Sequence, residues 1–109
     1  MLKRIYRLGK PARLVGDRGY GGQFFNVRFA RNGLLHNRYA FVVSKKVDKR
    51  AVMRNKLKRR LSACVEKMFS KIKTGYDIVF FTKKAAVFQT VENLYAEIES
   101  ALKKEKLLG

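Results

Sequence analysis

The chain has 109 residues, 47% of them hydrophobic, and its 26 Lys and Arg outnumber its 8 Asp and Glu, for a formal net charge of +18. This length suits one domain, residues 1–109, built around a single modest core. One cysteine, Cys64, excludes an internal disulfide and suits a reducing cytoplasm, and with one histidine, His36, there is no Cys/His zinc site. No apolar run approaches the roughly 18 residues of a membrane span.

The positive charge is unevenly distributed along the chain. Residues 1–76 contain 21 Lys and Arg against three acidic residues, whereas residues 77–109 contain five of each. So strong a positive field favours a polyanionic partner, with nucleic acid as the first candidate, and we expect the balanced last third to be neutral scaffold. We expect no small-molecule partner. We also expect no membrane partner, since no expected helix pairs a basic face with a Trp- or Phe-rich face.

Residues 1–22 show little hydrophobic periodicity and end in a glycine-rich stretch, which predicts a basic, flexible N-terminal segment. The sequence leaves open whether this segment folds before a partner binds. From Gln23 to Ala30 the residues alternate between two faces, which predicts a strand with one face in the core and one face open. The core face would carry Phe25, Val27 and Phe29, and the open face Phe24, Asn26 and Arg28.

A second strand is predicted over residues 39–44, where bulky residues alternate with smaller ones. Asn32-Gly33, between the two strands, is a turn signal, so we expect the strands to pair as a hairpin. The bulky side would carry Tyr39, Phe41 and Val43, and the other side Ala40, Val42 and Ser44.

From about Arg50 the apolar residues change to helical spacing, and we expect Thr74-Gly75 to end this helix. Cys64 falls within the apolar stripe and is therefore interpreted as a core residue. The stripe comprises Leu57, Leu61, Cys64, Val65, Met68, Phe69 and Ile72.

Residues 76–82 form a short apolar run rich in β-formers, which predicts a buried central strand. Thr90 can cap a final helix, whose acidic start and lysine-rich end suit the helix dipole. Its apolar stripe comprises Val91, Leu94, Tyr95, Ile98 and Leu102. The elements together indicate an α+β fold, a small two-layer sandwich of a mixed sheet with helices on one face. On the uncovered face, aromatic rings could stack bases while cations hold phosphates.

The stretch from Ser44 to Arg60 contains nine Lys and Arg and one acidic residue, Asp48. Several of the cations lie on the opening turns of the expected helix, where residues four apart stack on the same side. A positive cluster on a rigid element fits a phosphate backbone. We interpret Arg60, at the end of the stretch, as solvated charge.

These residues resemble the signature of one family, the protein component of bacterial ribonuclease P (the protein subunit of RNase P), over roughly residues 23–107. Two departures stand out: Lys56 takes the place of an arginine, and residues 2–15 lack the family's F-x-x-V-F pattern. The similar segments are Ser44-Lys45-Lys46-Val47, Ala51-Val52-Met53-Arg54-Asn55-Lys56-Leu57-Lys58-Arg59 and Gly75-Tyr76-Asp77-Ile78-Val79.

The resemblance implies an αβββαβα order, similar to domain 2 of ribosomal protein S5, with a left-handed crossover against the usual preference. It implies that a large RNA is the catalyst of the endoribonuclease, that it uses Mg²⁺ which protein side chains alone do not hold, and that it removes the 5′ leader of precursor tRNA. The implied partners are this catalytic RNA and the leader. The implied RNA-binding residues are Lys45, Lys46, Arg50, Arg54, Asn55, Lys56, Lys58 and Arg59, and the implied leader-cleft residues are Phe24, Asn26, Arg28 and Ser44.

Two other classes of function compete with this interpretation. A non-catalytic structural RNA-binding protein, of ribosomal or nucleoid type, fits the composition and size equally well, and only the motif between strand and helix favours the ribonuclease P family over it. A protein nuclease acting alone would need clustered carboxylates to hold its metal ions, whereas the 8 acidic residues are scattered. We therefore expect no catalytic residue in the protein.

Overall fold

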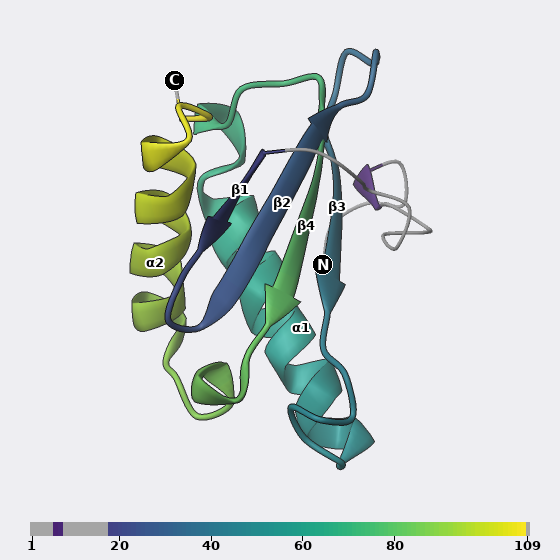
Figure 1. Ribbon diagram of the computed structural model, residues 1–109, viewed down its shortest axis with the longest axis vertical. Helices are drawn as coiled ribbons and strands as arrows, with labels where there is room; N and C mark the ends of the chain where they lie inside the picture. The colour runs from purple at the N-terminus through teal and green to yellow at the C-terminus, as the bar shows by residue number, and fades with distance from the viewer. Residues whose placement is uncertain (1–5, 8–17, 109) are drawn as a thin grey trace.

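The computed structural model describes residues 6–7 and 18–108 of the chain. Four strands and two α-helices follow one another in the order β1, β2, β3, α1, β4, α2 (Figure 1). Their bounds are Arg18–Gly21 for β1, Phe25–Arg31 for β2, Arg38–Val42 for β3, Ala51–Lys67 for α1, Tyr76–Thr82 for β4 and Val91–Lys104 for α2, with short 3₁₀ turns at Phe69–Lys71 and Lys84–Ala86.

The four strands form one mixed sheet in the order β1-β2-β4-β3. Strand β4 runs antiparallel to β2 and parallel to β3. In Figure 1 the arrows of β3 and β4 both point down, β4 lies to the left of β3, and α1 passes behind the sheet, so the β3–α1–β4 crossover is left-handed. The α+β sandwich and the crossover implied by the family resemblance are confirmed.

The predicted hairpin between the second and third strands is wrong, because β4 lies between them. A strand with a buried apolar centre is stabilised most where it has neighbours on both sides, and β4, with Ile78, Val79 and Phe80 buried, is such a strand. The loop after β2 is tied to the start of β4 instead: the Asn32 backbone N–H donates to the Gly75 carbonyl at 2.9 Å, and its side-chain amide donates to Asp77 Oδ1 at 3.1 Å. The Asn32-Gly33 signal marks a real turn, since Gly33 has a φ of 72°, but the turn leads to a longer loop.

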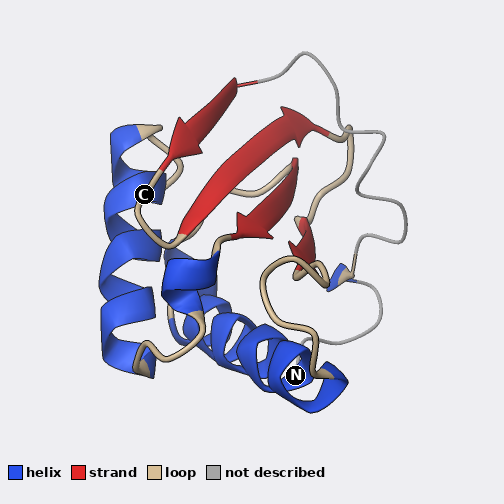
Figure 2. Cartoon of the chain, turned by 60° about the horizontal axis from the view of Figure 1, so that its bottom comes forward, coloured by secondary structure: helices blue, strands red, loops and turns tan. Residues whose placement is uncertain are grey.

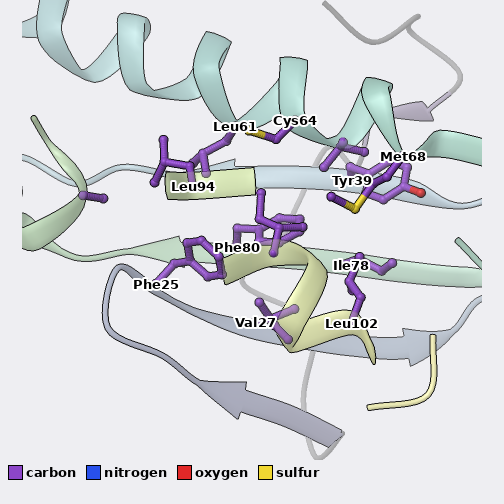
Figure 3. Packing of buried hydrophobic residues seen from close by; sticks show 14 of the residues in the cluster. Phe25, Val27, Tyr39, Leu61, Cys64, Met68, Ile78, Phe80, Leu94 and Leu102 are labelled. Carbon is purple, nitrogen blue, oxygen red and sulfur yellow. The ribbon is translucent and has the colours of Figure 1, made fainter. Parts of the chain in front are cut away.

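Both helices cover the same face of the sheet (Figure 2). Figure 3 shows side chains of the sheet and of the helices meeting in one hydrophobic cluster. The predicted core face of β2 is confirmed, as are the predicted stripes of the two helices. The sheet contributes Phe25, Val27, Phe29, Tyr39, Ile78 and Phe80, and the helices contribute Leu57, Leu61, Cys64, Val65, Leu94, Ile98 and Leu102, all of them buried.

Helix α1 ends at Lys67, seven residues before the predicted Thr74. Met68 and Ile72 remain in the core as predicted, but they are held there by a turn and an extended segment. Ile72 pairs with Leu108 in an isolated antiparallel bridge, and the Lys73 N–H donates to the Leu107 carbonyl at 2.7 Å. Pairing with the chain's C-terminal residues therefore replaces the last turns of the expected helix.

Strand β1, Arg18–Gly21, lies within the N-terminal segment of residues 1–22, where the sequence predicted no strand, so this element was missed. Four residues are enough for this strand because the β1–β2 turn is anchored to α2. The Glu97 carboxylate accepts the backbone N–H groups of Gln23 and Phe24, both at 2.9 Å. Most of the rest of this N-terminal segment, residues 1–5 and 8–17, lies outside the described residues. Within the described ranges, neither helix has the length and apolar character needed to cross a bilayer.

Candidate nucleic-acid interface

Helix α1 begins in the middle of the predicted basic stretch, at Ala51, without a side chain that caps its first backbone amides. Its N-cap, Arg50, makes no side-chain capping bond, and no acidic residue lies in the first turn. The unsatisfied N–H groups and the positive end of the helix dipole attract anions, phosphate above all. The sequence thus starts a helix without the usual cap and surrounds that start with cations.

The predicted RNA-binding residues divide by exposure. Lys56 and Arg59, three residues apart on α1, are exposed and lie on one side of the helix, and Asn55 is exposed beside them. Lys58 is half-buried. Lys45 and Lys46 are exposed in the turn that leads from β3 to α1. These six residues are free to meet a partner in the positions that the sequence predicted.

Arg50 and Arg54, also predicted to bind RNA, are both engaged within the protein. The Arg50 guanidinium donates twice to the Asp48 carboxylate, at 3.0 and 2.8 Å, and its backbone N–H donates to the same group at 2.8 Å. The hydrogen bonds from Arg50 lower the pKa of Asp48 to about 2. Arg54 Nη1 donates to the carbonyl oxygens of Asp48 and Lys49, at 3.0 and 2.8 Å, and so holds the loop in front of the helix.

Arg60 has a structural partner that the sequence did not indicate. Its Nη1 donates to the carbonyl oxygen of Val87 at 3.1 Å, which ties the middle of α1 to the loop before α2. The interpretation of Arg60 as solvated charge is therefore wrong. No local signal could have shown this contact, because the two residues are 27 positions apart in the sequence.

The open face of the sheet can be read from the strand register, because residues directly paired across strands share a face. Asn26 and Arg28 of β2 lie on this face, opposite the buried Phe25 and Val27, and both are exposed. Rows of partners then cross the sheet from β1 to β3. The first row is Gly21, Asn26, Phe81 and Val42; the second is Gly19, Arg28, Val79 and Ala40; and the third is Ala30, Asp77 and Arg38.

Phe81 is the aromatic residue of this face, which sequence reasoning missed. It is half-buried between Asn26 and Val42 in the first row. The signal was present in the alternation of residues 76–82, where Phe81 falls on the face opposite Ile78 and Phe80, but reading the run as buried on both sides concealed it. Beside Asn26, the glycines of β1 leave a depression of about 370 Å³ along Asn26 and Arg28.

Phe24 does not share this face, contrary to the prediction. It lies in the turn before β2, packs against the hydrophobic core and lines a depression with Asn93, Ala96 and Glu97 of α2. The anchoring of its backbone N–H by Glu97 is the physical reason, since it turns the chain toward α2 just before the strand starts. Ser44, the fourth predicted leader-cleft residue, is exposed between β3 and α1, and its carbonyl accepts the Val47 N–H at 3.0 Å.

One end of the open face is closed by an ion pair. Arg38 donates to both oxygens of Asp77 at 2.8 Å, and Asn32 donates to Asp77 as well. Partial burial opposes ionisation of Asp77, but the hydrogen bonds from Arg38 and Asn32 outweigh it and lower the pKa of the carboxyl. Asp77 therefore stays charged and paired with Arg38 at this end of the face.

Few of the described side chains are candidates for metal binding or nucleophilic catalysis. Among residues 6–7 and 18–108, no three His, Cys, Asp or Glu side chains gather closely enough to hold a metal ion. Cys64 is fully buried, and burial raises the pKa of its thiol to about 11, so it is no nucleophile at neutral pH. The described residues do not fit a protein-held metal centre.

Comparison with known proteins identifies the family. The family model described as "Ribonuclease P" matches residues 15–106. The chain is 33% identical over 105 residues to the ribonuclease P protein component of Caldanaerobacter subterraneus subsp. tengcongensis, covering 96% of this chain and 83% of the relative. It is 34% identical to that of Fusobacterium nucleatum, covering 92% and 82%.

A solved structure agrees with these sequence matches. The RNase P protein of Staphylococcus aureus superimposes with a TM-score of 0.83 at 28% identity, covering 95% of this chain and 98% of that one. The family match over residues 15–106 spans the sheet, both helices and the motif between β3 and α1, and it replaces the alternative of a ribosomal or nucleoid structural protein. The chain belongs to the ribonuclease P family, as a protein component of that endoribonuclease.

Proposed function

We propose that this protein binds the catalytic RNA of ribonuclease P through the start of α1 and holds the 5′ leader of precursor tRNA on the open face of its sheet. In this way it supports removal of the leader in the bacterial cytoplasm. The observation that carries the proposal is the uncapped, acid-free start of α1, surrounded by exposed cations next to an uncovered sheet.

The contact with the catalytic RNA would be made mainly to phosphates. Lys56 and Arg59 offer exposed charge on one helix side, Lys45 and Lys46 extend it into the preceding turn, and the helix amides add donors that need no side chain. Asn55 can add a hydrogen bond beside them. Arg50 and Arg54 take part by shaping the loop, while the remaining donors of each guanidinium stay available to a phosphate.

The leader would cross the open face between β1 and α1. Phe81 can stack a base, Arg28 can hold a phosphate, and Asn26 can donate or accept a hydrogen bond, while Gly19 and Gly21 leave room at the edge. Ser44 lies where this face meets the cationic start of α1. Stacking is tolerant of base identity, which suits a protein that meets many different leaders.

The hydrolysis itself would belong to the RNA subunit. We infer that divalent metal ions, Mg²⁺ in the first place, act with the RNA, since the described side chains offer them no cage. The protein's own residues bind, position and neutralise. Purified protein should therefore leave precursor tRNA intact, whereas protein with a bacterial ribonuclease P RNA should cleave it at magnesium concentrations too low for the RNA alone. Cleavage by protein freed of RNA would overturn this division of roles.

The test of the α1 interface removes two exposed charges. In Lys56→Ala/Arg59→Ala we expect weaker binding to the catalytic RNA and a flatter salt dependence, with the slope of log K against log salt reduced by about 1.4–1.8 for two phosphates. Arg54 is left in place because its loss would also release the loop that it holds. The matched control is Lys67→Ala/Lys84→Ala, two exposed lysines outside this surface. Equal slopes in the two variants would remove α1 from the interface.

A further inference from the structure

The far end of the molecule brings together lysines from two distant segments. Figure 1 shows the end of α2 and the segment after α1 at the top, and the start of α1 at the bottom. The bridge between Ile72 and Leu108, and the hydrogen bond from the Lys73 N–H to the Leu107 carbonyl, join these segments. The C-terminal cationic end is defined by four exposed residues, Lys71, Lys73, Lys103 and Lys106.

The backbone beneath this surface is rigid. The N–H of Lys73 is fixed by Leu107 at 2.7 Å, and its carbonyl oxygen accepts from Asn37 Nδ2, also at 2.7 Å. Asn37 is only 3% exposed and is itself fixed, since its side-chain oxygen accepts the Tyr76 N–H at 2.8 Å. Lys73 is thus an exposed cation mounted on a backbone whose two polar groups are both satisfied, which lowers the entropic cost of binding a ligand.

Lys106 adds an independent observation. Its φ of 60° is left-handed, and among the described residues it is the one non-glycine with a positive φ. It occupies the position after the C-cap of α2 at which glycine is normally favoured: the Lys106 N–H donates to the Lys103 carbonyl at 3.1 Å and the Leu107 N–H to the Leu102 carbonyl at 2.7 Å. Lys106 therefore holds, at the end of α2, a conformation that glycine would adopt without strain.

The charges of α2 are separated along its length. Glu92, Glu97 and Glu99 lie in its first nine residues, and Glu97 is engaged by the β1–β2 turn, whereas the lysines gather at its end. Glu105 is the acidic residue at that end, and it is half-buried, whereas the lysines there are exposed. The last third of the chain is therefore neutral in sum, while within α2 the acidic residues lie toward the start and the lysines at the end.

We propose that the C-terminal cationic end is a second RNA-binding surface, which takes the phosphate backbone of a separate segment of the catalytic RNA. Helix α1, with 17 residues, spans about 26 Å at 1.5 Å per residue, so this surface and the start of α1 lie further apart than the ~10 Å over which charges act in salt solution. The two surfaces therefore need two phosphate tracks, and a large folded RNA provides them where a short leader does not. This inference rests on the family's RNA partner but not on the α1 interface.

The test compares two variants of the same four positions. The Lys→Gln variant at positions 71, 73, 103 and 106 removes the charges, and the Lys→Arg variant keeps them. Binding of the catalytic RNA to the Gln variant should weaken by on the order of tenfold or more near 0.15 M salt, with the salt slope reduced by up to about 3, and the Arg variant should bind as the unmodified protein does. Thermal unfolding of both variants checks that they fold. Equal affinity and slope in the two variants would overturn the proposal.

Separate RNAs distinguish the source of the phosphates. In the Gln variant, affinity should fall for the catalytic RNA and in assembly of the holoenzyme from it. Once assembly is saturated, the enzymes made with the Gln variant and with the Arg variant should bind precursor tRNA equally well, and mature tRNA equally well. A loss of tRNA binding alone would overturn the choice of partner. An equal loss for an unrelated RNA of the same length would mean general attraction to polyanions and no built site. A failed Lys56→Ala/Arg59→Ala test with a successful Gln-variant test would reject only the α1 interface.

A position-specific crosslink keeps the proposal testable if the Gln variant folds poorly. The chain's one native cysteine, Cys64, is fully buried, so a photoreactive label attaches selectively to the exposed thiol of Lys106→Cys. We expect crosslinks to one region of the catalytic RNA, different from the region reached from Lys56→Cys. Crosslinks to the same region from both positions, or none from position 106, would overturn a second surface.

Discussion

Phe81 offers the sharpest test at the scale of single residues. It lies on the open face in register with Asn26 and Val42, and replacing it with alanine should remove a stacked base of the leader. We expect precursor tRNA to bind the reconstituted enzyme less tightly by about 1–3 kcal/mol, with mature tRNA unaffected and Phe81→Trp retaining the affinity, because each base stacks on any π-face.

The matched control is Phe88→Ala, which removes an aromatic ring that is 81% exposed on the loop before α2, away from the open face. This variant should bind both substrates as the unmodified protein does. Equal losses for precursor and mature tRNA in Phe81→Ala would indicate damage to the sheet or to RNA assembly, and would argue against a leader contact at this position.

Single residues were predictable where local pattern decides their position. The exposed residues of the basic stretch, the core position of Cys64 and the open-face positions of Asn26 and Arg28 follow from periodicity alone. Phe24 and Phe81 did not, because the face of each depends on a distant partner: Glu97 redirects the chain at Phe24, and the pairing of β4 with β2 brings Phe81 beside Asn26.

At the scale of elements, the end of α2 makes a stability prediction. Lys106 holds a left-handed conformation that costs an L-residue about 1–2 kcal/mol, and glycine adopts it without that cost, though with more entropy lost on folding. Lys106→Gly should therefore raise the free energy of unfolding by about 0.5–1 kcal/mol in urea denaturation. Lys103→Gly, inside the last turn of the same helix, should lower it by up to about 1 kcal/mol. A destabilised Lys106→Gly would mean that the lysine side chain itself holds the helix end.

The elements themselves were largely predictable, and their partners were not. Residues 76–82 are a strand and residues 91–104 a helix, as their patterns predicted, and Thr90 Oγ1 accepts the Asn93 N–H at 3.2 Å as the expected N-cap. The hairpin was mispredicted because sequence proximity favoured pairing β2 with β3, while burial of the apolar centre of β4, Ile78 to Phe80, favours neighbours on both sides. Helix α1 ended early because Ile72 pairs with Leu108, a contact across 36 residues that no local pattern contains.

At the scale of the whole molecule, the described residues carry two separate clusters of exposed cations at opposite ends. The start of α1 carries one cluster, and the joined termini of α1 and α2 carry the other. Composition predicted the polyanionic partner, and the motif after β3 predicted the first cluster. The second cluster could not be predicted from the sequence because Lys71 and Lys73 lie at least 30 positions from Lys103 and Lys106. In addition, the acidic residues of the last third equal its lysines in number, so its net charge is zero.

A net charge of +18 on 109 residues should make the stability of the protein depend on salt. Raising NaCl from 50 to 300 mM shortens the screening length from about 14 Å to about 6 Å, which weakens the repulsion among the cations. The same salt weakens the ion pairs Arg38–Asp77 and Arg50–Asp48, but the arginine of each pair is solvent-exposed, so water already screens much of the attraction. We therefore expect the midpoint of thermal unfolding to rise by several degrees, as measured by calorimetry without RNA, since 1 kcal/mol shifts a domain of this size by roughly 4–8 °C. The Gln variant of the C-terminal cationic end, with four charges fewer, should show a smaller rise, and the Arg variant the full one. A midpoint that falls with NaCl in the unmodified protein would mean that its few ion pairs outweigh the repulsion.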